Sequence, residues 1–202
     1  MKLATVFSGI GAIEQALIRL GIDYHIAFAC DNGDVELNLL EGKELEEYTS
    51  LKKLRSKKQL RNENDIKRLE ELGKKENDIA ESIRNDVKRM SGSKEKKEAI
   101  DKLYCSKSRQ TNFVKKTYMA NYGNHINEDD FHLDVHFLDG RDYANRVDMM
   151  VGGSPCQSFS SNGKRGGFED TRGTLFHEYA RIISEVQPKC FIFENVRGLQ
   201  HP

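Results

Sequence analysis

Short apolar runs alternate with amphipathic runs at both ends of the chain. The apolar runs are typical of strands buried on both faces of a sheet, and they cover residues 3–7, 24–30, 132–138, 146–151 and 190–195. Apolar residues recur at helical spacing over residues 11–21, 112–123 and 174–188. Strands that alternate with helices predict an α/β fold with a Rossmann-like, doubly wound and mostly parallel sheet.

The stretch from about residue 41 to 110 has a different pattern. About half of it is charged, it lacks proline, and its apolar residues are spaced as on the seams of helices. We predict a helical insertion of two or more solvent-exposed helices, with breaks near Gly73 and at residues 91–93. A charged run of this kind most often marks a solvated face, and the alternative is an arm that contacts phosphates or a partner.

Composition and charge limit the class of protein. With 202 residues, 37% of them hydrophobic, the chain can form one domain (residues 1–202) with a proper core. It has no apolar run of eighteen residues and no signal-peptide pattern, so we expect a cytoplasmic protein without membrane contact. The formal net charge is zero, but residues 41–109 hold 20 Lys and Arg against 15 Asp and Glu, a local net charge of +5.

The four cysteines are far apart, so neither a zinc site nor a disulfide framework is expected. Cys156 differs from the other three because it follows Pro155 just beyond a predicted strand, where open α/β sheets bind ligands. Proline fixes the local backbone, and Lys164 and Arg165 in the loop behind it would lower the pKa of a nearby thiol. Cys156 is therefore a candidate nucleophile, and the alternative is a packing cysteine.

A second candidate site begins at residues 7–12 ("FSGIGA"), between the first strand and the first helix. Glycines there let backbone amides approach a ligand at a helix N-terminus, although a tight turn explains the same residues. Asp31 lies 20 residues after Gly11, at a strand end where a carboxylate commonly accepts ribose hydroxyls. With Asp134 at the end of the third strand, these residues predict a nucleoside pocket of unspecified base.

The last predicted strand ends in "FENV" (residues 193–196). Glu194 would reach the same edge of the sheet as Cys156, because the two strands are neighbours in a doubly wound order. A glutamate at a strand end is ordinary when it stands alone. Opposite a thiol and a nucleoside pocket, Glu194 becomes a candidate proton donor.

In these motifs the chain resembles the prokaryotic DNA (cytosine-5)-methyltransferases. "FSGIGA" is similar to the family's cofactor motif, and residues 152–176 are similar to its proline–cysteine motif with the mobile loop behind it. "FENVRGL" (residues 193–199) is similar to its glutamate–asparagine–valine motif. The resemblance covers residues 1–37 and about 112–202 but not the insertion, and it implies the bacterial cytoplasm and a restriction-modification system.

The resemblance implies S-adenosylmethionine as cofactor, S-adenosylhomocysteine as product, no metal, and double-stranded DNA as partner. It assigns the cofactor pocket to Phe7, Gly9, Ile10, Gly11, Asp31, Asp134, Val135, Gly153, Pro155 and Leu175. The catalytic residues it implies are Cys156 as nucleophile, Glu194 as the group that protonates or hydrogen-bonds cytosine N3, and Asn195 as its support. The loop residues expected to contact DNA are Gln157, Ser160, Lys164 and Arg165.

The resemblance also implies the reaction. The Cys156 thiolate adds to C6 of cytosine while Glu194 donates a proton toward N3, and C5 then attacks the sulfonium methyl group. Loss of the C5 proton expels the thiolate. Because stacking hides the ring, the cytosine must flip out of the duplex, and we expect the loop after Cys156 to open for DNA and close over the base.

The family pattern extends further than "ENVRGLQHP". Further strands, another active-site motif and a target-recognition domain would follow there. We therefore expect either a fragment of a longer chain or one subunit of a split enzyme whose second chain supplies these parts.

Three alternatives stay open at this point. A tRNA cytosine-5 methyltransferase would use the same mechanism on another substrate. A non-catalytic subunit would use only the cofactor pocket. An NAD-dependent dehydrogenase would fit "FSGIGA" and Asp31, but it would leave "PCQ" and "ENV" without a role.

Overall fold

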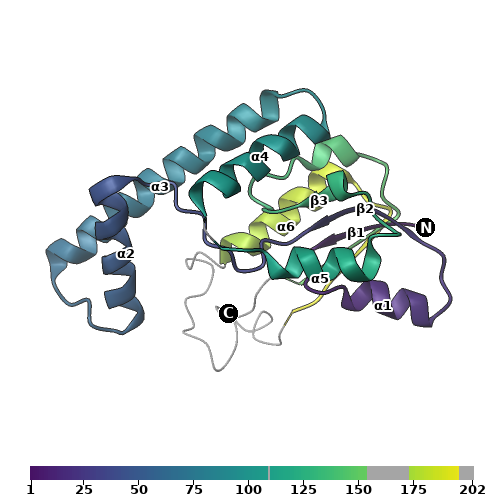
Figure 1. The fold of residues 1–202 in the computed structure, drawn as a ribbon, viewed down its shortest axis with the longest axis horizontal. Helices are drawn as coiled ribbons and strands as arrows, with labels where there is room; N and C mark the ends of the chain where they lie inside the picture. Colours follow the sequence, from purple (N-terminus) through teal and green to yellow (C-terminus); the bar gives the residue numbers. More distant parts are fainter. Residues whose placement is uncertain (109, 154–172, 196–202) are drawn as a thin grey trace.

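A computed structural model describes residues 1–108, 110–153 and 173–195 as a parallel sheet with helices on both faces (Figure 1). The strands of these residues are β1 (Lys2–Val6), β2 (His25–Cys30), β3 (Phe131–His132), β4 (Met149–Gly152) and β5 (Cys190–Phe193). Their order is β3-β2-β1-β4-β5, and every neighbouring pair is parallel. The order reverses at β1, so the predicted doubly wound α/β fold is confirmed.

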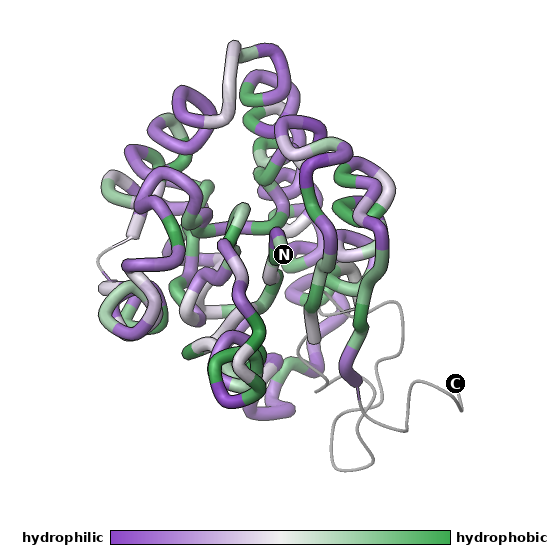
Figure 2. Tube along the Cα trace, turned by 90° about the vertical axis from the view of Figure 1, so that its right-hand side faces the viewer, coloured by the Kyte–Doolittle hydropathy of each residue, from purple (hydrophilic) through white to green (hydrophobic). Residues whose placement is uncertain are grey.

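Two layers of helices cover the sheet. The helices outside the insertion are α1 (Ala12–Arg19), α5 (Phe113–Tyr122) and α6 (Gly173–Val186), with short 3-10 turns η1 (Glu128–Asp130) and η2 (Gly140–Tyr143). Successive residues of a strand point to opposite faces. Leu3 therefore packs with Leu17 of α1 and Tyr118 of α5, whereas Ala4 packs with Tyr179 of α6. Seen from the side in Figure 2, hydrophobic segments gather between the layers and hydrophilic turns face outward.

The third strand is shorter than the sequence predicts. We expected a strand over residues 132–138, but β3 ends at His132. The Asp134 side chain accepts a hydrogen bond from the His136 amide at 2.9 Å, and the amide of Leu138 bonds to the Asp134 carbonyl at 3.1 Å. An aspartate that bonds the backbone two residues further on stabilises a turn, which ends the strand here.

Three helices lie between β2 and α5: α2 (Gly42–Ser56), α3 (Glu63–Arg89) and α4 (Ser93–Lys107). The predicted break near Gly73 is wrong, because α3 runs through this position without interruption. A glycine inside a helix costs only about 1 kcal/mol. The adjacent Leu69 and Leu72 pack with Leu40 and Leu51 in a buried cluster, and this packing holds the helix together.

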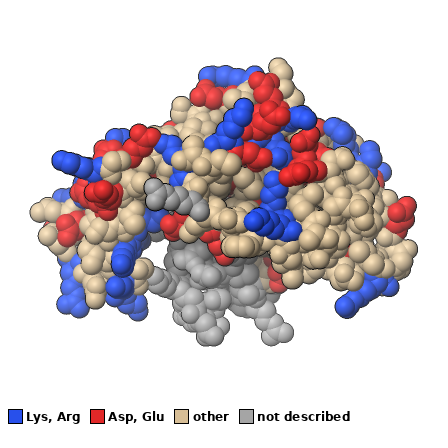
Figure 3. Space-filling model, in the orientation of Figure 1, with Lys and Arg blue, Asp and Glu red and all other residues tan. Residues whose placement is uncertain are grey.

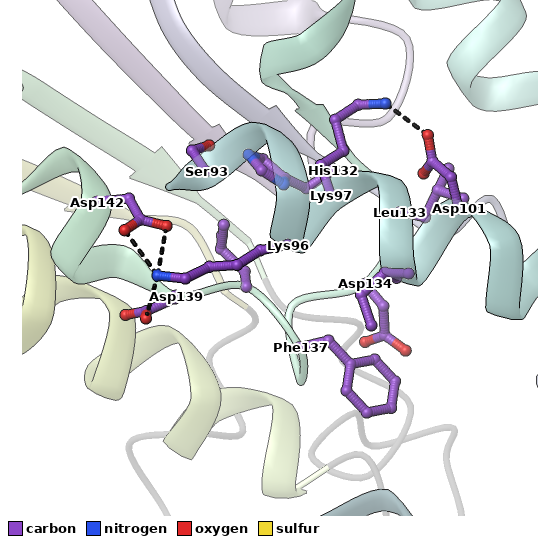
Figure 4. A pocket seen from close by; sticks show the side chains of 12 residues that line it. Ser93, Lys96, Lys97, Asp101, His132, Leu133, Asp134, Phe137, Asp139 and Asp142 are labelled. Atoms are coloured by element: carbon purple, nitrogen blue, oxygen red, sulfur yellow. Dashed lines mark hydrogen bonds and ion pairs between the residues drawn. The ribbon is translucent and has the colours of Figure 1, made fainter. Parts of the chain in front are cut away.

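The predicted break at residues 91–93 is confirmed, since Gly92 (φ 84°) precedes α4. The expectation that these helices are merely solvent-exposed is wrong for α4. Its Lys96 is only 8% exposed, and its ammonium group binds Asp139 at 2.8 Å and Asp142 at 2.7 Å (Figure 4). A buried lysine needs such partners, so α4 is fastened to the segment that follows β3.

The described residues also contain neither a helix that is long and apolar enough to cross a membrane nor a group of three or more His, Cys, Asp or Glu side chains placed to hold a metal ion. At one edge of the described sheet, β5 leaves the side chains of Phe191 and Ile192 about half exposed.

Candidate active site

The turn after β1 brings backbone amides to the carboxyl edge of the sheet. The amides of Phe7 and Ser8 donate to the Cys30 carbonyl at 2.8 and 3.3 Å, which ties the turn to β2. Phe7, Gly9 and Gly11 all have positive φ angles of 58°, 53° and 88°. A left-handed conformation costs a residue such as Phe7 about 1–2 kcal/mol, so the surrounding contacts must hold this turn in place.

Asp31 joins that turn to the loop after β2. Its carboxylate accepts the Gly9 amide at 2.8 Å and the Gly33 amide at 2.7 Å, one on each oxygen. Burial raises the pKa of Asp31, although these two backbone hydrogen bonds oppose the rise. Each carboxylate oxygen has a second lone pair that can still accept a hydrogen bond, which fits a ligand with two adjacent hydroxyl groups.

The turn also holds a buried hydroxyl that lacks a partner. Within the described part of the chain, the Ser8 hydroxyl oxygen is inaccessible to solvent and makes no hydrogen bond. A buried polar group left in this state costs about 1–3 kcal/mol. Next to it, the side chain of Ile10 is 62% exposed. A ligand with a polar group and an apolar surface would satisfy both.

Asp134 is the second carboxylate at this edge, and its side chain is 12% exposed. One oxygen accepts the Tyr104 hydroxyl at 2.7 Å, and the other accepts the His136 amide at 2.9 Å and His136 Nδ1 at 2.8 Å. Burial favours the neutral acid, but the bonds from His136 and Tyr104 outweigh it and lower the pKa of Asp134. The two oxygens of the Asp134 carboxylate have four lone pairs, and three of them accept these hydrogen bonds. One lone pair therefore remains for a donor group of a ligand.

The two carboxylates flank the end of β2. Burial raises the pKa of the Cys30 thiol, and the negative charges of Asp134 and Asp31 raise it further. Both charges therefore act on the same buried sulfur. Asp31 and Asp134 therefore lie near the same end of β2, and the pocket that they would line together stays a prediction.

Apolar residues assigned to the pocket also meet. Val135 is 4% exposed and belongs to the core cluster beneath α6. Phe7 and Leu175 pack against that same cluster from the turn after β1 and from α6. The Val135 carbonyl is held by Arg181 at 2.7 Å.

Gly153 and Glu194 meet where β4 and β5 end. The Glu194 amide donates to the Gly152 carbonyl at 2.9 Å, which continues the parallel pairing by one residue. A β-carbon on Gly153 would lie 2.8 Å from Glu194 Oε2 and 3.1 Å from the Glu194 carbonyl oxygen, so a larger residue at position 153 would push the Glu194 side chain aside. Glu194 is exposed and accessible from the carboxyl edge. Asn195 follows it directly.

Several predicted site residues lie outside the described residues: Pro155, Cys156, Gln157, Ser160, Lys164 and Arg165.

Sequence reasoning missed two residues of the site. Asn112 donates from its side chain to the Asp31 carbonyl at 2.9 Å, and it also caps α5 by accepting the Lys115 amide at 2.8 Å. An asparagine just before an amphipathic run is a readable capping signal. Tyr104 had no such signal, because it lies in a highly charged helix whose packing partner is far away in sequence.

The site and fold define a class of protein. Residues 98–202, more than half of the chain, match the model of the C-5 cytosine-specific DNA methylase family. The chain belongs to this family.

Its relatives include DNA methyltransferases of known type. The chain is 51% identical over 88 residues to the type II methyltransferase M1.ScrFI of Lactococcus lactis subsp. cremoris, a match that covers 44% of this chain and 21% of that protein. It is 47% identical over 89 residues to the type II methyltransferase M.HpaII of Haemophilus parainfluenzae, covering 44% and 24%. With M.Eco47II of Escherichia coli the identity is 58% over 66 residues, covering 33% and 16%. The chain thus spans less than a quarter of these relatives.

Proposed function

We propose that this chain is the catalytic part of a DNA (cytosine-5)-methyltransferase that modifies DNA in a bacterial restriction-modification system and acts in the cytoplasm. The observation that best supports the proposal is the close approach of Gly153 and Glu194. It sets a carboxyl group at the carboxyl edge of the sheet, within a short length of chain from Cys156. Family membership and the names of the relatives support the same reaction.

S-adenosylmethionine fits the residues on the other side of β1. Asp31 can accept the two ribose hydroxyls, Asp134 can accept the adenine amino group, and the amides and orphan hydroxyl of the turn can meet polar groups of the amino acid part. Ile10, Val135 and Leu175, with Phe7 and Pro155, would supply the apolar surface. When bound, this cofactor supplies an activated methyl group.

The protein's own groups would then act on cytosine. The Cys156 thiolate forms a bond to C6 while Glu194 gives a proton or hydrogen bond to N3, which makes C5 electron-rich. Asn195 would hold Glu194 in place. After methyl transfer, the C5 proton leaves to a base, the electron pair re-forms the C5–C6 double bond, and the thiolate departs.

The target base would have to leave the double helix, because stacking protects C6 in duplex DNA. The loop after Cys156, with Gln157, Ser160, Lys164 and Arg165, is proposed to close over the extruded base and contact phosphates. Residues 41–110 are proposed as an insertion in this catalytic domain. Target recognition would come from elsewhere, in a continuation of the chain or a second subunit.

The test is a comparison of two cysteine variants, assayed with any chain that supplies the rest of the enzyme. Cys156→Ser should abolish methyl transfer to duplex DNA while the affinity for S-adenosylhomocysteine, measured by calorimetry, changes less than about threefold. Cys105→Ser is the matched control, since Cys105 is an exposed thiol on α4, and it should retain activity. Methylation by Cys156→Ser near the parent rate would refute the proposal, and transfer to tRNA but not to DNA would replace its substrate.

A further inference from the structure

A run of positive charge lies at the junction of α2 and α3. Between Tyr48 and Asn62 the chain contains no acidic residue. It contains six basic residues, all exposed, which we call the basic tip: Lys52, Lys53, Arg55, Lys57, Lys58 and Arg61.

The basic tip lacks the neutralising partners found elsewhere in the insertion. Several cations outside the tip pair with carboxylates, for example Arg68 with Glu47 at 3.0 Å and Lys75 with Glu44 at 2.7 Å. Within the described part of the chain, none of the six basic-tip residues forms an ion pair. Lys52 instead lies over the ring of Tyr48, 5.0 Å from its centre. Like charges gathered without counter-charges repel one another, and a polyanion would relieve that repulsion.

The tip is held away from the sheet by a firmly anchored helix. Near the end of α3, Arg84 pairs with Glu178 of α6 at 2.9 Å and donates to the His136 carbonyl at 2.7 Å. From Arg84 back to Glu63 the helix rises 1.5 Å per residue, or about 30 Å in all. We call α2 together with residues 63–84 of α3 the arm. The buried cluster around Leu51 and Leu72 packs these two helices against each other.

The arm projects on the side of the molecule where the strands end. In Figure 1 the strands point toward α2, so the tip and the carboxyl edge with Asp31 and Glu194 share one side of the molecule. Figure 3 shows Lys and Arg side chains gathered on the lower surface of the lobe that α2 and the start of α3 form. The charge therefore lies beside the approach to the proposed active site and not behind it.

We propose that the basic tip binds the phosphate backbone of duplex DNA next to the target cytosine. The inference rests on the proposed function, which places DNA at the carboxyl edge. Lysine and arginine contacts to phosphates add affinity without reading sequence. The tip thus gives the catalytic part a hold on DNA that is independent of any target-recognition domain.

The experiment compares two triple variants with the same loss of charge. The tip variant is Lys57→Gln/Lys58→Gln/Arg61→Gln, and the control is Lys74→Gln/Arg89→Gln/Lys102→Gln, at exposed positions of α3 and α4 outside the tip. The three tip positions lie in the turn between α2 and α3, and glutamine keeps helix propensity at the three control positions. Every changed side chain is exposed, so both variants should fold. Binding to a fluorescent duplex is measured by anisotropy across a range of KCl concentrations, and S-adenosylhomocysteine binding is measured alongside.

We expect the tip variant to bind DNA at least about tenfold more weakly at 0.1 M salt and to lower the slope of log Kd against log salt by about 1 to 3. The control and the affinity for S-adenosylhomocysteine should stay at the parent values. Equal losses in both variants, or none in the tip variant, would overturn the inference while leaving the proposed function intact. Tip-dependent binding of tRNA but not of duplex DNA would also overturn it. A parent protein that binds neither DNA nor S-adenosylhomocysteine would refute the proposed function itself.

Discussion

Tyr104 shows how a single residue outside the motifs can set the properties of one inside them. Its hydroxyl donates to Asp134, while its ring is 6% exposed and packs with Val35 and Phe137. Val35 follows Asp31 closely and Phe137 follows Asp134 closely in sequence. Tyr104 therefore packs against the loops of both carboxylates, and we propose that it positions Asp134.

Removal of that hydroxyl should weaken cofactor binding. Tyr104→Phe frees one Asp134 oxygen to turn, and a hydrogen bond to a charged group contributes about 1.5–3 kcal/mol, so we expect S-adenosylhomocysteine to bind about tenfold more weakly. S-inosylhomocysteine, which lacks the 6-amino donor, should be affected much less. The ratio of the two affinities does not depend on the folded fraction, because both ligands bind the same folded molecules.

Tyr48→Phe is the matched control, since that hydroxyl lies near Glu76 within the insertion, and the charge of Glu76 helps burial to raise its pKa. It should leave both affinities unchanged. Equal weakening of the two ligands by Tyr104→Phe would show that Tyr104 has only a structural role.

His132 should make stability depend on pH. It is 8% exposed and its Nε2 lies 2.7 Å from the Tyr143 hydroxyl. Burial, with the charges of Lys97 and Lys115, lowers its pKa from 6.5 to about 3. Below pH 6.5 the unfolded chain therefore takes up a proton that the folded protein refuses, and stability falls as pH falls from 6.5 toward 3.

Between pH 7 and pH 5 this one group should lower the free energy of unfolding by about 2 kcal/mol. The variant His132→Gln lacks that contribution, so its urea-unfolding free energy should fall by about 2 kcal/mol less over the same interval. Parallel pH profiles for parent and variant would show that His132 is protonated in the folded protein.

At the scale of elements, glycines decide how closely helices and strands approach. Gly11 ends the turn after β1, and its carbonyl accepts the Tyr122 hydroxyl of α5 at 2.6 Å. A β-carbon there would lie 2.1 Å from the Tyr122 ring, whereas one on Gly9 would meet nothing within 4 Å. Both residues have positive φ, so they differ in the room available for a β-carbon and not in backbone conformation.

Alanine substitutions at Gly9 and Gly11 separate the cost of backbone strain from the cost of a steric clash. Gly9→Ala should lower the free energy of unfolding by about 1–2 kcal/mol, the cost of a left-handed alanine. Gly11→Ala should cost a further 1–3 kcal/mol or so, because Tyr122 must move. Equal losses in thermal or urea unfolding would contradict the close packing of α1 on α5.

The sequence predicted most elements outside the insertion because their apolar patterns are local. It failed where a distant contact overrides the local signal. Gly73 stays helical because Leu69 and Leu72 pack against α2, and β3 is short because Asp134 forms a turn. Neither the packing of α3 on α2 nor the turn at Asp134 can be predicted from the local hydrophobic pattern.

At the scale of the whole molecule, α2, α3 and α4 are docked onto the rest of the fold by charge as well as by apolar contacts. Lys96 with Asp139 and Asp142 is the most buried of these links. Arg141 also binds Asp139 at 2.8 Å. Lys94, two residues before Lys96, pairs with Asp129 at 3.0 Å in a largely exposed setting.

Loss of the buried lysine should therefore matter far more than loss of the exposed one. Lys96→Met removes one cationic partner from each of two carboxylates, Asp139 and Asp142, and among the residues that the structure describes only Asp139 keeps another, in Arg141. The substitution should cost about 3 kcal/mol of unfolding free energy. Lys94→Met should cost less than about 1 kcal/mol. Similar values for both would mean that the insertion is not docked through Lys96.

The candidate site could be predicted from sequence as far as its motifs reach. The sequence indicates "FSGIGA", Asp31 and Glu194 because each directly follows a predicted strand. In the structure the Gly9 amide bonds to Asp31, and Gly153 lies close to Glu194. Tyr104 and the orientation of the arm could not be predicted, because both depend on how a charged insertion packs onto a sheet.

The most direct test of the account is a covalent trap. Duplex DNA containing 5-fluorocytosine at the target position is incubated with S-adenosylmethionine and the protein, together with any chain that completes it. Fluorine cannot leave C5 as the proton does, so the enzyme should stay bonded to C6, and mass spectrometry should locate the adduct on Cys156. Methyl transfer without an adduct, or an adduct on Cys30, Cys105 or Cys190, would contradict the account.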